Sequence, residues 1–234
     1  MKKHLFLLVL LFPCLLKAMD PLLKAALDGD SVQVQTLISS NNYAMLSDKK
    51  VLVKALHAAV AKNNLNSVQF LLFIGVPVDA SIDGWTALHY ALLHERAEVL
   101  EVLLKSGANI TKIIPEDTST PLHMAVRSNN IKLILPILRA AFSQNLSYEV
   151  VNAKDAHKLS PLHYAVTLGA SACISIQLLL RSGADVSVIV RKDHQAYTLF
   201  DYVPSSQVDK DSVVNCIKTT LLKMLKARLA EKRA

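Results

Sequence analysis

The chain has 234 residues and a formal net charge of +7, with 52% hydrophobic, 19% charged and 6% aromatic residues. This composition excludes an intrinsically disordered chain and supplies enough Leu, Ala and Val for a large core of closely packed helices. The charge falls to +4 when the three lysines of residues 1–18 are set aside, and a charge of that size gives no reason to expect a nucleic acid as partner.

The first 18 residues resemble an export signal. Lys2 and Lys3 precede an almost unbroken apolar run from Leu5 to Leu16, and the small residue Ala18 follows. This order is typical of a secretory signal peptide, and the run is shorter than the roughly 20 residues that span a bilayer. We predict a cleaved signal over residues 1–18 and a periplasmic or secreted protein, with an uncleaved membrane anchor or a buried helix as alternatives. The Met-Lys-Lys opening favours a bacterial source.

A short motif, Leu-His-x-Ala, recurs along the rest of the chain. Its clear copies are Leu56–Ala59, Leu88–Ala91, Leu122–Ala125 and Leu162–Ala165, and eroded copies lie at Pro21–Ala25 and Thr198–Val203. The leucines at positions 22, 56, 88, 122 and 162, and Phe200 at the equivalent place of the last copy, are 34, 32, 34, 40 and 38 residues apart. A period near 33 residues predicts a row of similar units, each of which covers the apolar side of the next.

Longer segments carry a resemblance to a known family. Asp83–Ala91 resembles the turn and first helix of an ankyrin repeat, and Val99–Asn109 and Leu178–Asp185 resemble its second helix and exit. The resemblance covers about residues 20–203 and implies an all-α solenoid of five to six helix–turn–helix units. We expect the ankyrin-repeat domain over residues 19–207, with units near 20–48, 50–79, 83–112, 117–150, 155–188 and 194–207.

The resemblance implies a structural role for the repeated histidine, which in this family hydrogen-bonds neighbouring backbone and ties adjacent turns together. Equivalent histidines of stacked helices lie about 8–10 Å apart, too far to share an ion whose bonds are about 2 Å long. We therefore expect no metal site. The residues expected to form this repeat framework are His57, Thr86, His89, Thr120, Pro121, His123, Ser160, Pro161 and His163, with Gly75, Gly107 and Gly183 ending the second helices.

Catalytic motifs are missing from the sequence. His94–Glu98 begins like a zinc-protease helix, but Glu98 stands where the second histidine ligand must be. The chain contains neither a phosphate-binding G-x-x-x-x-G-K-[ST] loop nor a G-x-S-x-G nucleophile turn. We predict a protein that is not an enzyme and that needs no cofactor and no small-molecule substrate.

Two units depart from the repeat pattern. In the fourth, Pro136 falls inside the second helix and is expected to kink it, and Ala141 replaces the exit glycine. Residues 142–150 then form an insertion that we expect to be a loop, either shaping a binding edge or varying neutrally. In the second unit, Val51–Lys54 stands where the third has its turn motif, so we expect the chain to enter the helix more directly there.

Residues 208–234 are predicted to form a basic, amphipathic capping helix. Its apolar residues recur at three- and four-residue steps, and they are Val214, Ile217, Leu221, Leu225 and Leu229. Cys173 and Cys216 lack the spacing of a zinc site. The simplest interpretation treats both as small buried hydrophobic residues, and a disulfide between them is the alternative if the chain is exported.

The resemblance also implies where a partner docks, since ankyrin proteins bind through turn tips and through the concave face of the first helices. The implied turn-tip residues are Asp83, Trp85, Asp117, Ser119, His157, Leu159 and Tyr197, and the helix-face residues are Leu93, His94, Arg127, Ser128, Thr167 and Leu168. Trp85 is the only tryptophan and belongs to a residue type enriched in binding hot spots. The alternative is that Trp85 folds back onto Tyr90 or a neighbouring turn.

The function implied by the resemblance is that of a monomeric scaffold that binds an unidentified protein. Nucleic acid is not expected, because the basic residues are not interleaved with aromatic ones. Two alternatives remain at this point. One is a membrane-anchored ankyrin protein held by its uncleaved N-terminus, and the other is a regulatory subunit of a partner enzyme.

Overall fold

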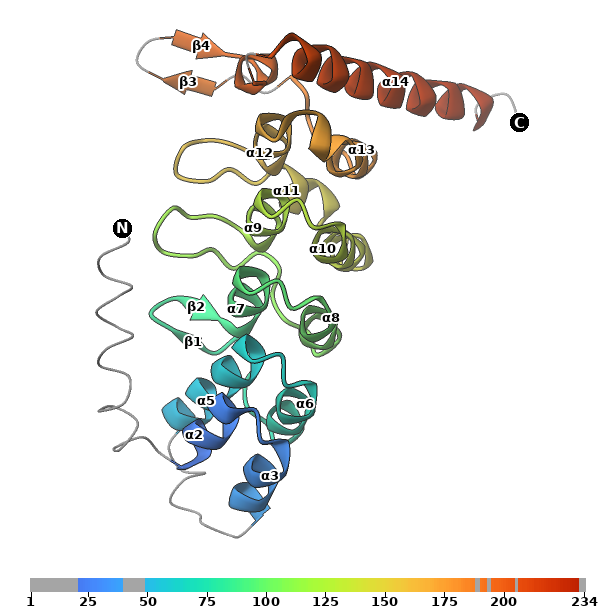
Figure 1. The fold of residues 1–234 in the computed structure, drawn as a ribbon. Helices are drawn as coiled ribbons and strands as arrows, with labels where there is room; N and C mark the ends of the chain where they lie inside the picture. The colour runs from blue at the N-terminus through green and yellow to red at the C-terminus, as the bar shows by residue number, and fades with distance from the viewer. Residues whose placement is uncertain (1–20, 40–48, 188–189, 193–194, 205, 232–234) are drawn as a thin grey trace.

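The computed structural model describes residues 21–39, 49–187, 190–192, 195–204 and 206–231, so the expected signal over residues 1–18 lies outside the described residues. The described part of the chain is an elongated, all-α solenoid of stacked helix pairs (Figure 1). The pairs are α2 (Pro21–Asp28) with α3 (Ser31–Ser39), α5 (Lys49–Ala61) with α6 (Leu65–Phe73), α7 (Ala87–Leu93) with α8 (Ala97–Lys105), α9 (Pro121–Arg127) with α10 (Ile131–Ser143), and α12 (Pro161–Thr167) with α13 (Cys173–Arg181).

Shorter elements connect and close the stack. The hairpin of β1 (Ser81–Ile82) and β2 (Trp85–Thr86) precedes α7, α11 (Ser147–Asn152) follows α10, and the 3-10 helix η1 (Gly169–Ala172) precedes α13. A second antiparallel hairpin, β3 (Val190–Lys192) with β4 (Gln195–Tyr197), leads into the 3-10 helix η2 (Leu199–Tyr202) and the long helix α14 (Gln207–Glu231). Figure 1 shows the turns projecting from the column of first helices, with α14 lying across the far end.

The core is shared between neighbouring units. Leu88, Leu122 and Leu162, one from each successive first helix, are fully buried, and α7 packs against both α5 and α9. Burial of each leucine side chain contributes roughly 1.5–3 kcal/mol to the stability of the folded state. No unit can cover its own leucine alone, so stability depends on the contact between units.

The repeated histidine joins each turn to the next. The backbone N–H of Thr86 donates to Nδ1 of His89 (3.1 Å), so the proton lies on Nε2, which donates to the carbonyl of Lys112 in the following turn (3.0 Å). His123 repeats both bonds, with Thr120 N–H at 3.2 Å and the Leu159 carbonyl at 3.0 Å. His89 and His123 therefore each cap their own helix and bridge to the neighbouring unit. His163 accepts the Ser160 N–H (3.1 Å), but its buried Nε2 has no hydrogen-bond partner within the described structure.

The second unit makes only half of this arrangement. Helix α5 begins at Lys49, so residues 51–54 are helical and the chain enters the helix directly, as the missing turn motif predicts. His57 Nε2 lies 3.3 Å from the carbonyl oxygen of Ala80, but its buried Nδ1 has no hydrogen-bond partner within the described structure. Lys54 occupies the place of Thr86, so there is no hydroxyl for the ring to meet.

Adjacent turns approach each other closely at Gly84. This residue has a φ of 84°, and a Cβ atom built there would lie 2.2 Å from Cγ of Pro115 in the next turn. A larger residue would therefore strain the backbone and also push the two turns apart. The glycine in the turn motif is required by this contact between units.

The structure corrects the prediction of a loop at residues 142–150. Helix α10 runs through Pro136 and past Ala141 to Ser143, and α11 forms after a short connection. No glycine stands at position 141 to end the helix, and Ala141, Val150 and Val151 are buried. The insertion is therefore largely helical and is anchored in the core by Val150, while Phe142 and Tyr148 are 79% and 69% exposed.

A second correction concerns the face by which α14 packs. The buried residues are Val213, Cys216, Ile217 and Thr220, which contact α13 and η1. Of the predicted apolar stripe, Ile217 is buried, but Leu221, Leu225 and Leu229 are 38%, 55% and 49% exposed. The last repeat covers only the first half of this long helix, so the later leucines have no neighbour to pack against.

The two cysteines adopt the alternative of a disulfide. Cys173 on α13 is bonded to Cys216 on α14, with Cα atoms 6.1 Å apart. Asp209 adds a second attachment, because its Oδ1 accepts the Ala170 N–H of η1 (3.1 Å). The first half of α14 is therefore fixed to the last repeat. None of the described helices is long and apolar enough to cross a bilayer.

Candidate partner-binding surface

The first helices and the turns before them form one continuous side of the solenoid, which we call the first-helix face (Figure 1). Beyond the second unit, the residue that follows the repeated histidine or its equivalent lies on this face and is half-buried. Three of these four positions carry tyrosine. They are Tyr90, Met124, Tyr164 and Tyr202, the last following Asp201 in place of histidine. The second unit has Ala58 at this position, so the stack itself does not require an aromatic ring there.

Three rings meet around Tyr90, and the four residues form what we call the aromatic cluster: His57, Trp85, Tyr90 and His94. The Tyr90 ring centroid lies 4.8 Å from His57, 5.8 Å from Trp85 and 6.5 Å from His94. His94 is exposed, while Trp85 and Tyr90 are half-buried. This cluster presents several aromatic edges and faces to solvent at the third unit.

Trp85 does not project freely from its turn. Its Nε1–H donates to Oε1 of Glu116 in the following turn (2.9 Å), and its ring leans on Tyr90. The structure therefore combines both sequence interpretations, since the tryptophan folds back but remains half-exposed. Its orientation is set by two units together.

The ionisation states of the cluster are set mainly by burial. Burial and the nearby Arg96 lower the pKa of His94, so its ring is neutral at pH 7. Burial, together with the charges of Asp83 and Glu116, raises the pKa of the Tyr90 phenol. The cluster therefore offers neutral rings and a protonated hydroxyl, which suit apolar contact and hydrogen bonding.

The fourth and fifth units complete the first-helix face differently, with what we call the arginine network: Asp117, Arg127, Asp155 and Tyr164. Arg127 donates to Oδ2 of Asp117 (2.8 Å) and to the Tyr164 hydroxyl (2.8 Å), and its guanidinium carbon lies 4.2 Å from the Tyr164 ring centroid. The Tyr164 hydroxyl donates to the carboxylate of Asp155.

Asp155 is the buried centre of this network. It is 5% exposed, and its Oδ1 accepts the N–H groups of His157 (2.9 Å) and Leu159 (3.0 Å). Burial opposes ionisation of Asp117, but hydrogen bonds from Ser119 and Arg127 hold the pKa of that carboxyl below its usual value. Asp117 and Arg127 were predicted to face a partner, yet they are mainly bonded to each other and to the fold.

The remaining predicted contact residues divide by exposure. Ser119 is fully buried, which rules it out as a contact, because the turn closes over it with the Ser119 N–H bonded to Asp117. Ser128, Leu159, Leu168 and Tyr197 are half-buried. The exposed residues are Asp83, Leu93, His94, His157 and Thr167.

Tyr90, Tyr164 and Tyr202 were not among the contact residues predicted from the sequence. Tyr90 and Tyr164 each stand directly after the repeated histidine, inside the motif that defined the repeats. Tyr202 lies 5.3 Å from His163 and 6.4 Å from Tyr197, ring to ring. The signal in the sequence is that aromatic residues recur directly after the repeated histidine, at a position where the second unit has alanine.

The framework histidines offer no chemistry of their own. Burial lowers the pKa of His57 to about 4, and burial also lowers the pKa values of His89, His123 and His163. Within the described ranges, no group of three or more His, Cys, Asp or Glu side chains is placed to hold a metal. The arrangement supports recognition through rings and hydrogen bonds.

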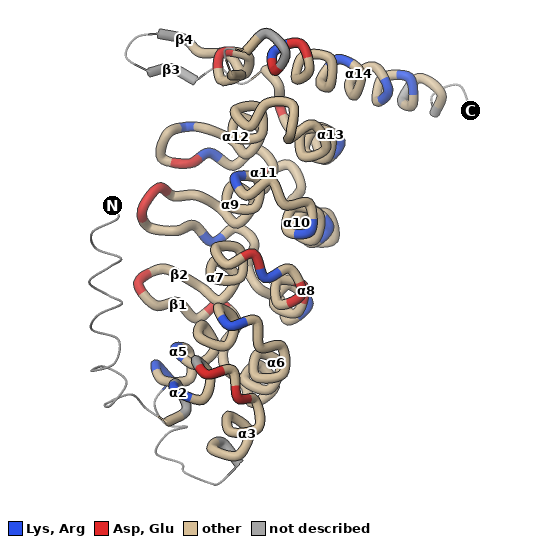
Figure 2. Tube along the Cα trace, viewed as in Figure 1, with Lys and Arg blue, Asp and Glu red and all other residues tan. Residues whose placement is uncertain are grey.

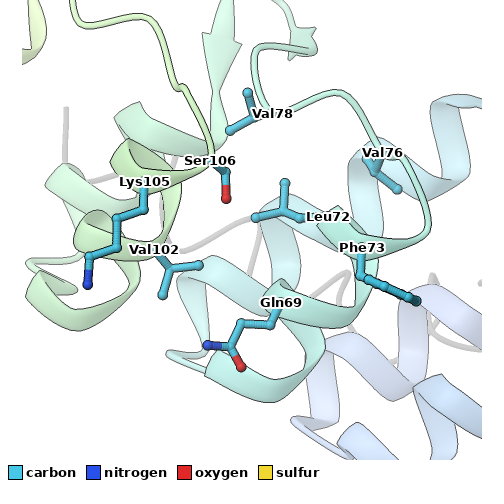
Figure 3. A pocket seen from close by; sticks show the side chains of 8 residues that line it. All are labelled: Gln69, Leu72, Phe73, Val76, Val78, Val102, Lys105 and Ser106. Carbon is cyan, nitrogen blue, oxygen red and sulfur yellow. The ribbon is translucent and has the colours of Figure 1, made fainter.

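A different kind of surface lies on the second helices. A groove of about 540 Å³ between α6 and α8 is lined by Leu72, Val76, Val78 and Val102, with Phe73 at its rim (Figure 3). Phe73 is 85% exposed. The polar side chains of Gln69, Lys105 and Ser106 also line the groove.

Comparison with known proteins gives matches to ankyrin repeats along much of the chain. A model of three ankyrin-repeat copies matches residues 22–114, a model of many copies matches residues 94–135, and a single-repeat model matches residues 157–190. The aromatic cluster lies within the first match. Residues 136–156, which include α11, lie between matches.

Relatives among characterised proteins share these repeats. A putative ankyrin repeat protein of fowlpox virus (strain NVSL), FPV223, is 34% identical over 118 residues, which are 49% of this chain and 75% of the viral protein. The E3 ubiquitin-protein ligase KEG of Arabidopsis thaliana is 35% identical over 94 residues, which are 40% of this chain and 5% of the ligase. The nuclear factor NF-kappa-B p105 subunit of Gallus gallus is 29% identical over 107 residues, 46% of this chain and 10% of that protein.

Proposed function

Because this chain belongs to the ankyrin-repeat family, we propose that it is a protein-interaction scaffold whose first-helix face holds a partner protein. The observation that carries the proposal is the aromatic cluster. Tyr90 stands where the second unit has Ala58, so the stack does not need its ring, yet three further rings gather around it. Half-exposed aromatic groups of this kind supply much of the binding energy at protein interfaces.

The contact surface extends along both sides of the cluster. Leu93 adds exposed apolar surface beside His94, and Asp83 adds a carboxylate at the turn. The partner then meets an apolar centre with a polar border, which is the usual anatomy of an interface. The arginine network keeps the neighbouring turns in place, so the surface is organised before the partner arrives.

Replacement of His94 and Tyr90 tests this function. We expect Tyr90→Ala and His94→Ala to lower affinity for the captured partner by about 2 kcal/mol each, or roughly thirtyfold, the loss typical of a hot spot. Phe142→Ala is the matched control, because Phe142 is 79% exposed on the second-helix side. Affinity capture with the full chain, compared across the three variants by quantitative mass spectrometry, gives the result. Capture that is lost with Phe142→Ala and retained with the other two would overturn the proposal.

Catalysis is not part of this proposal. The name of the Arabidopsis relative describes a ligase, but the chain matches 5% of that protein, and the family matches here are ankyrin repeats. A regulatory subunit of a partner enzyme stays an alternative, and co-purified enzymatic activity would identify it. The proposed scaffold is a monomer that uses neither a nucleic acid nor a cofactor.

We also propose that the protein is exported. The support is the signal-like pattern of residues 1–18 together with the Cys173–Cys216 disulfide, since disulfides persist in oxidising compartments. N-terminal sequencing of the mature chain is expected to start near Met19. An intact N-terminus would favour the membrane-anchored alternative. The bacterial source rests only on the Met-Lys-Lys opening, because the relatives described above come from a virus, a plant and a bird.

A further inference from the structure

Helix α14 has two apolar faces, of which the last repeat uses one. Val213, Cys216, Ile217 and Thr220 face α13 and η1 and are buried. Leu221, Leu222, Leu225 and Leu229 are 38%, 55%, 55% and 49% exposed, and we call these four residues the outer leucine strip. Capping elements of repeat proteins normally turn a polar side to solvent, so this strip is unexpected for a cap.

The strip faces away from the stack. With 3.6 residues per turn, Leu222, Leu225 and Leu229 lie roughly a third to a half of a turn around the helix from Val213. Figure 1 shows the second half of α14 extending beyond α13 at the end of the solenoid. A flat surface can therefore approach the strip without meeting the repeats.

Between Asp211 and Glu231, the charges along α14 are all of one sign. The chain has no acidic residue between Asp211 and Glu231, whereas Lys218, Lys223 and Lys226 lie in this stretch with exposed side chains. Figure 2 shows basic positions along the second half of α14 and the acidic ones at its start. Two copies of this helix would bring lysines together, and like charges repel, so self-pairing is disfavoured.

We infer that the second half of α14, residues 218–231, binds the surface of a bilayer that contains anionic phospholipid. The leucines enter the boundary between headgroups and acyl chains, and the lysine stems reach past them so that each ammonium meets a phosphodiester. Basic residues near an anionic surface contribute about 1 kcal/mol each. Leucine burial and charge attraction together are what an interfacial helix needs.

The attachment of α14 to the last repeat sets the orientation of the bound protein. The disulfide to Cys173 and the bond from Ala170 to Asp209 hold the first half of the helix across the end of the stack. A bilayer under the outer leucine strip therefore meets the C-terminal end of the solenoid. The repeats then extend away from the membrane and leave the first-helix face open.

Vesicle sedimentation with the full chain tests the inference. The probes are vesicles of phosphatidylcholine alone and vesicles of about three parts phosphatidylcholine to one part phosphatidylglycerol. We expect binding to the mixed vesicles that weakens in high salt. Leu225→Glu and Leu229→Glu should each reduce the partition coefficient at least about tenfold, whereas Phe142→Glu on α10 should not change it.

A matched lysine series isolates the charge contribution. Replacement of Lys218, Lys223 and Lys226 by glutamine should abolish the preference for mixed vesicles, and replacement of the exposed Lys112, Lys132 and Lys158 should retain it. All of these side chains are exposed, so thermal melts by circular dichroism should agree among the variants.

Three outcomes would overturn the inference. The first is equal binding to both vesicle types, which assigns the contact to the apolar residues 1–18. The second is binding unchanged by Leu225→Glu. The third is a concentration-dependent dimer in sedimentation velocity that Leu225→Glu dissolves, without vesicle binding by the original chain, which identifies a second copy as the occupant.

Discussion

The third unit and the fourth and fifth units use the same positions of the first-helix face in different ways. In the arginine network, the hydrogen-bonding groups satisfy one another around a buried carboxylate. In the aromatic cluster, the rings rest on one another, and His94 is left exposed. One repeat position can therefore strengthen the stack in one unit and remain available for a ligand in another. Repeat position alone does not tell which use applies.

The histidines that contact Tyr90 and Tyr164 differ in their framework bonds. His123 contacts Tyr164 of the arginine network and makes both framework bonds, whereas His57 contacts Tyr90 of the aromatic cluster and makes one. The framework bonds vary from unit to unit, because His89, which contacts Trp85, makes both, whereas the buried Nε2 of His163 has no hydrogen-bond partner within the described structure. Four experiments, in order of expected effect, can break or sharpen this contrast.

Acid should produce the largest loss of stability. The folded pKa of His57 is about 4, and the unfolded pKa is about 6.5, so the unfolded chain binds more protons between these values. The contribution of neutral His57 to the free energy of unfolding is fully present above this window and is lost as the pH falls through it. His57 alone accounts for a loss on the order of 3 kcal/mol, and the other framework histidines add to it in the same direction.

Urea unfolding at a series of pH values measures this loss. His57→Gln should flatten the slope between about pH 6.5 and pH 4. A free energy of unfolding that does not change across this window would show that the framework histidines are not buried as described.

Removal of the buried carboxylate should rank next. Asp155→Ala leaves the Tyr164 hydroxyl and two backbone N–H groups without their acceptor and removes the carboxylate that lies 3.6 Å from Arg127. We expect the free energy of unfolding to fall by about 3 kcal/mol. Asp83→Ala is the control, because Asp83 is exposed at a turn. Equal effects of the two substitutions in urea titrations would refute a stabilising role for the arginine network.

The two histidines themselves should differ more modestly. We expect His123→Ala to lower the free energy of unfolding by about 2 kcal/mol, because a helix cap and a hydrogen bond between turns are lost together. His57→Ala removes only the hydrogen bond between turns and should lower the free energy of unfolding by about 1 kcal/mol. Thermal and urea denaturation at pH 7 compare them, and a larger loss for His57→Ala would reverse the contrast.

The smallest effect on stability is expected in the aromatic cluster. His94→Ala should change the free energy of unfolding by less than about 0.5 kcal/mol, because its ring is exposed. The same substitution should weaken partner capture, as described above. A strong destabilisation by His94→Ala would mean that the cluster serves the stack and not a partner.

The sequence predicts most of the fold because the repeat period, the histidine and the turn glycine each have a local physical reason. It fails where contacts between units decide the outcome. Helix α14 carries two apolar stripes, and only the position of α13 selects Val213 and Cys216 over Leu225. The sequence also could not show that Glu116, from the next turn, holds Trp85 against Tyr90.

The insertion shows the same limit. Residues 142–150 lack the pattern of a standard repeat, but Val150 and Val151 fill space beside α12 that exists only once the fifth unit is stacked. The sequence predicts the candidate site only in part. Of the predicted contact residues, Trp85 and His94 lie in the aromatic cluster, whereas Asp117 and Arg127 bond to each other within the fold.

The bond between Trp85 and Glu116 gives the molecule a built-in optical reporter. Trp85 is the only indole in the chain, and it joins the turns of the third and fourth units. Its emission therefore responds to separation of those two units, whereas ellipticity averages over every helix. Because linear repeat arrays can fray from one end, unequal midpoints from the two signals would locate where the solenoid first opens.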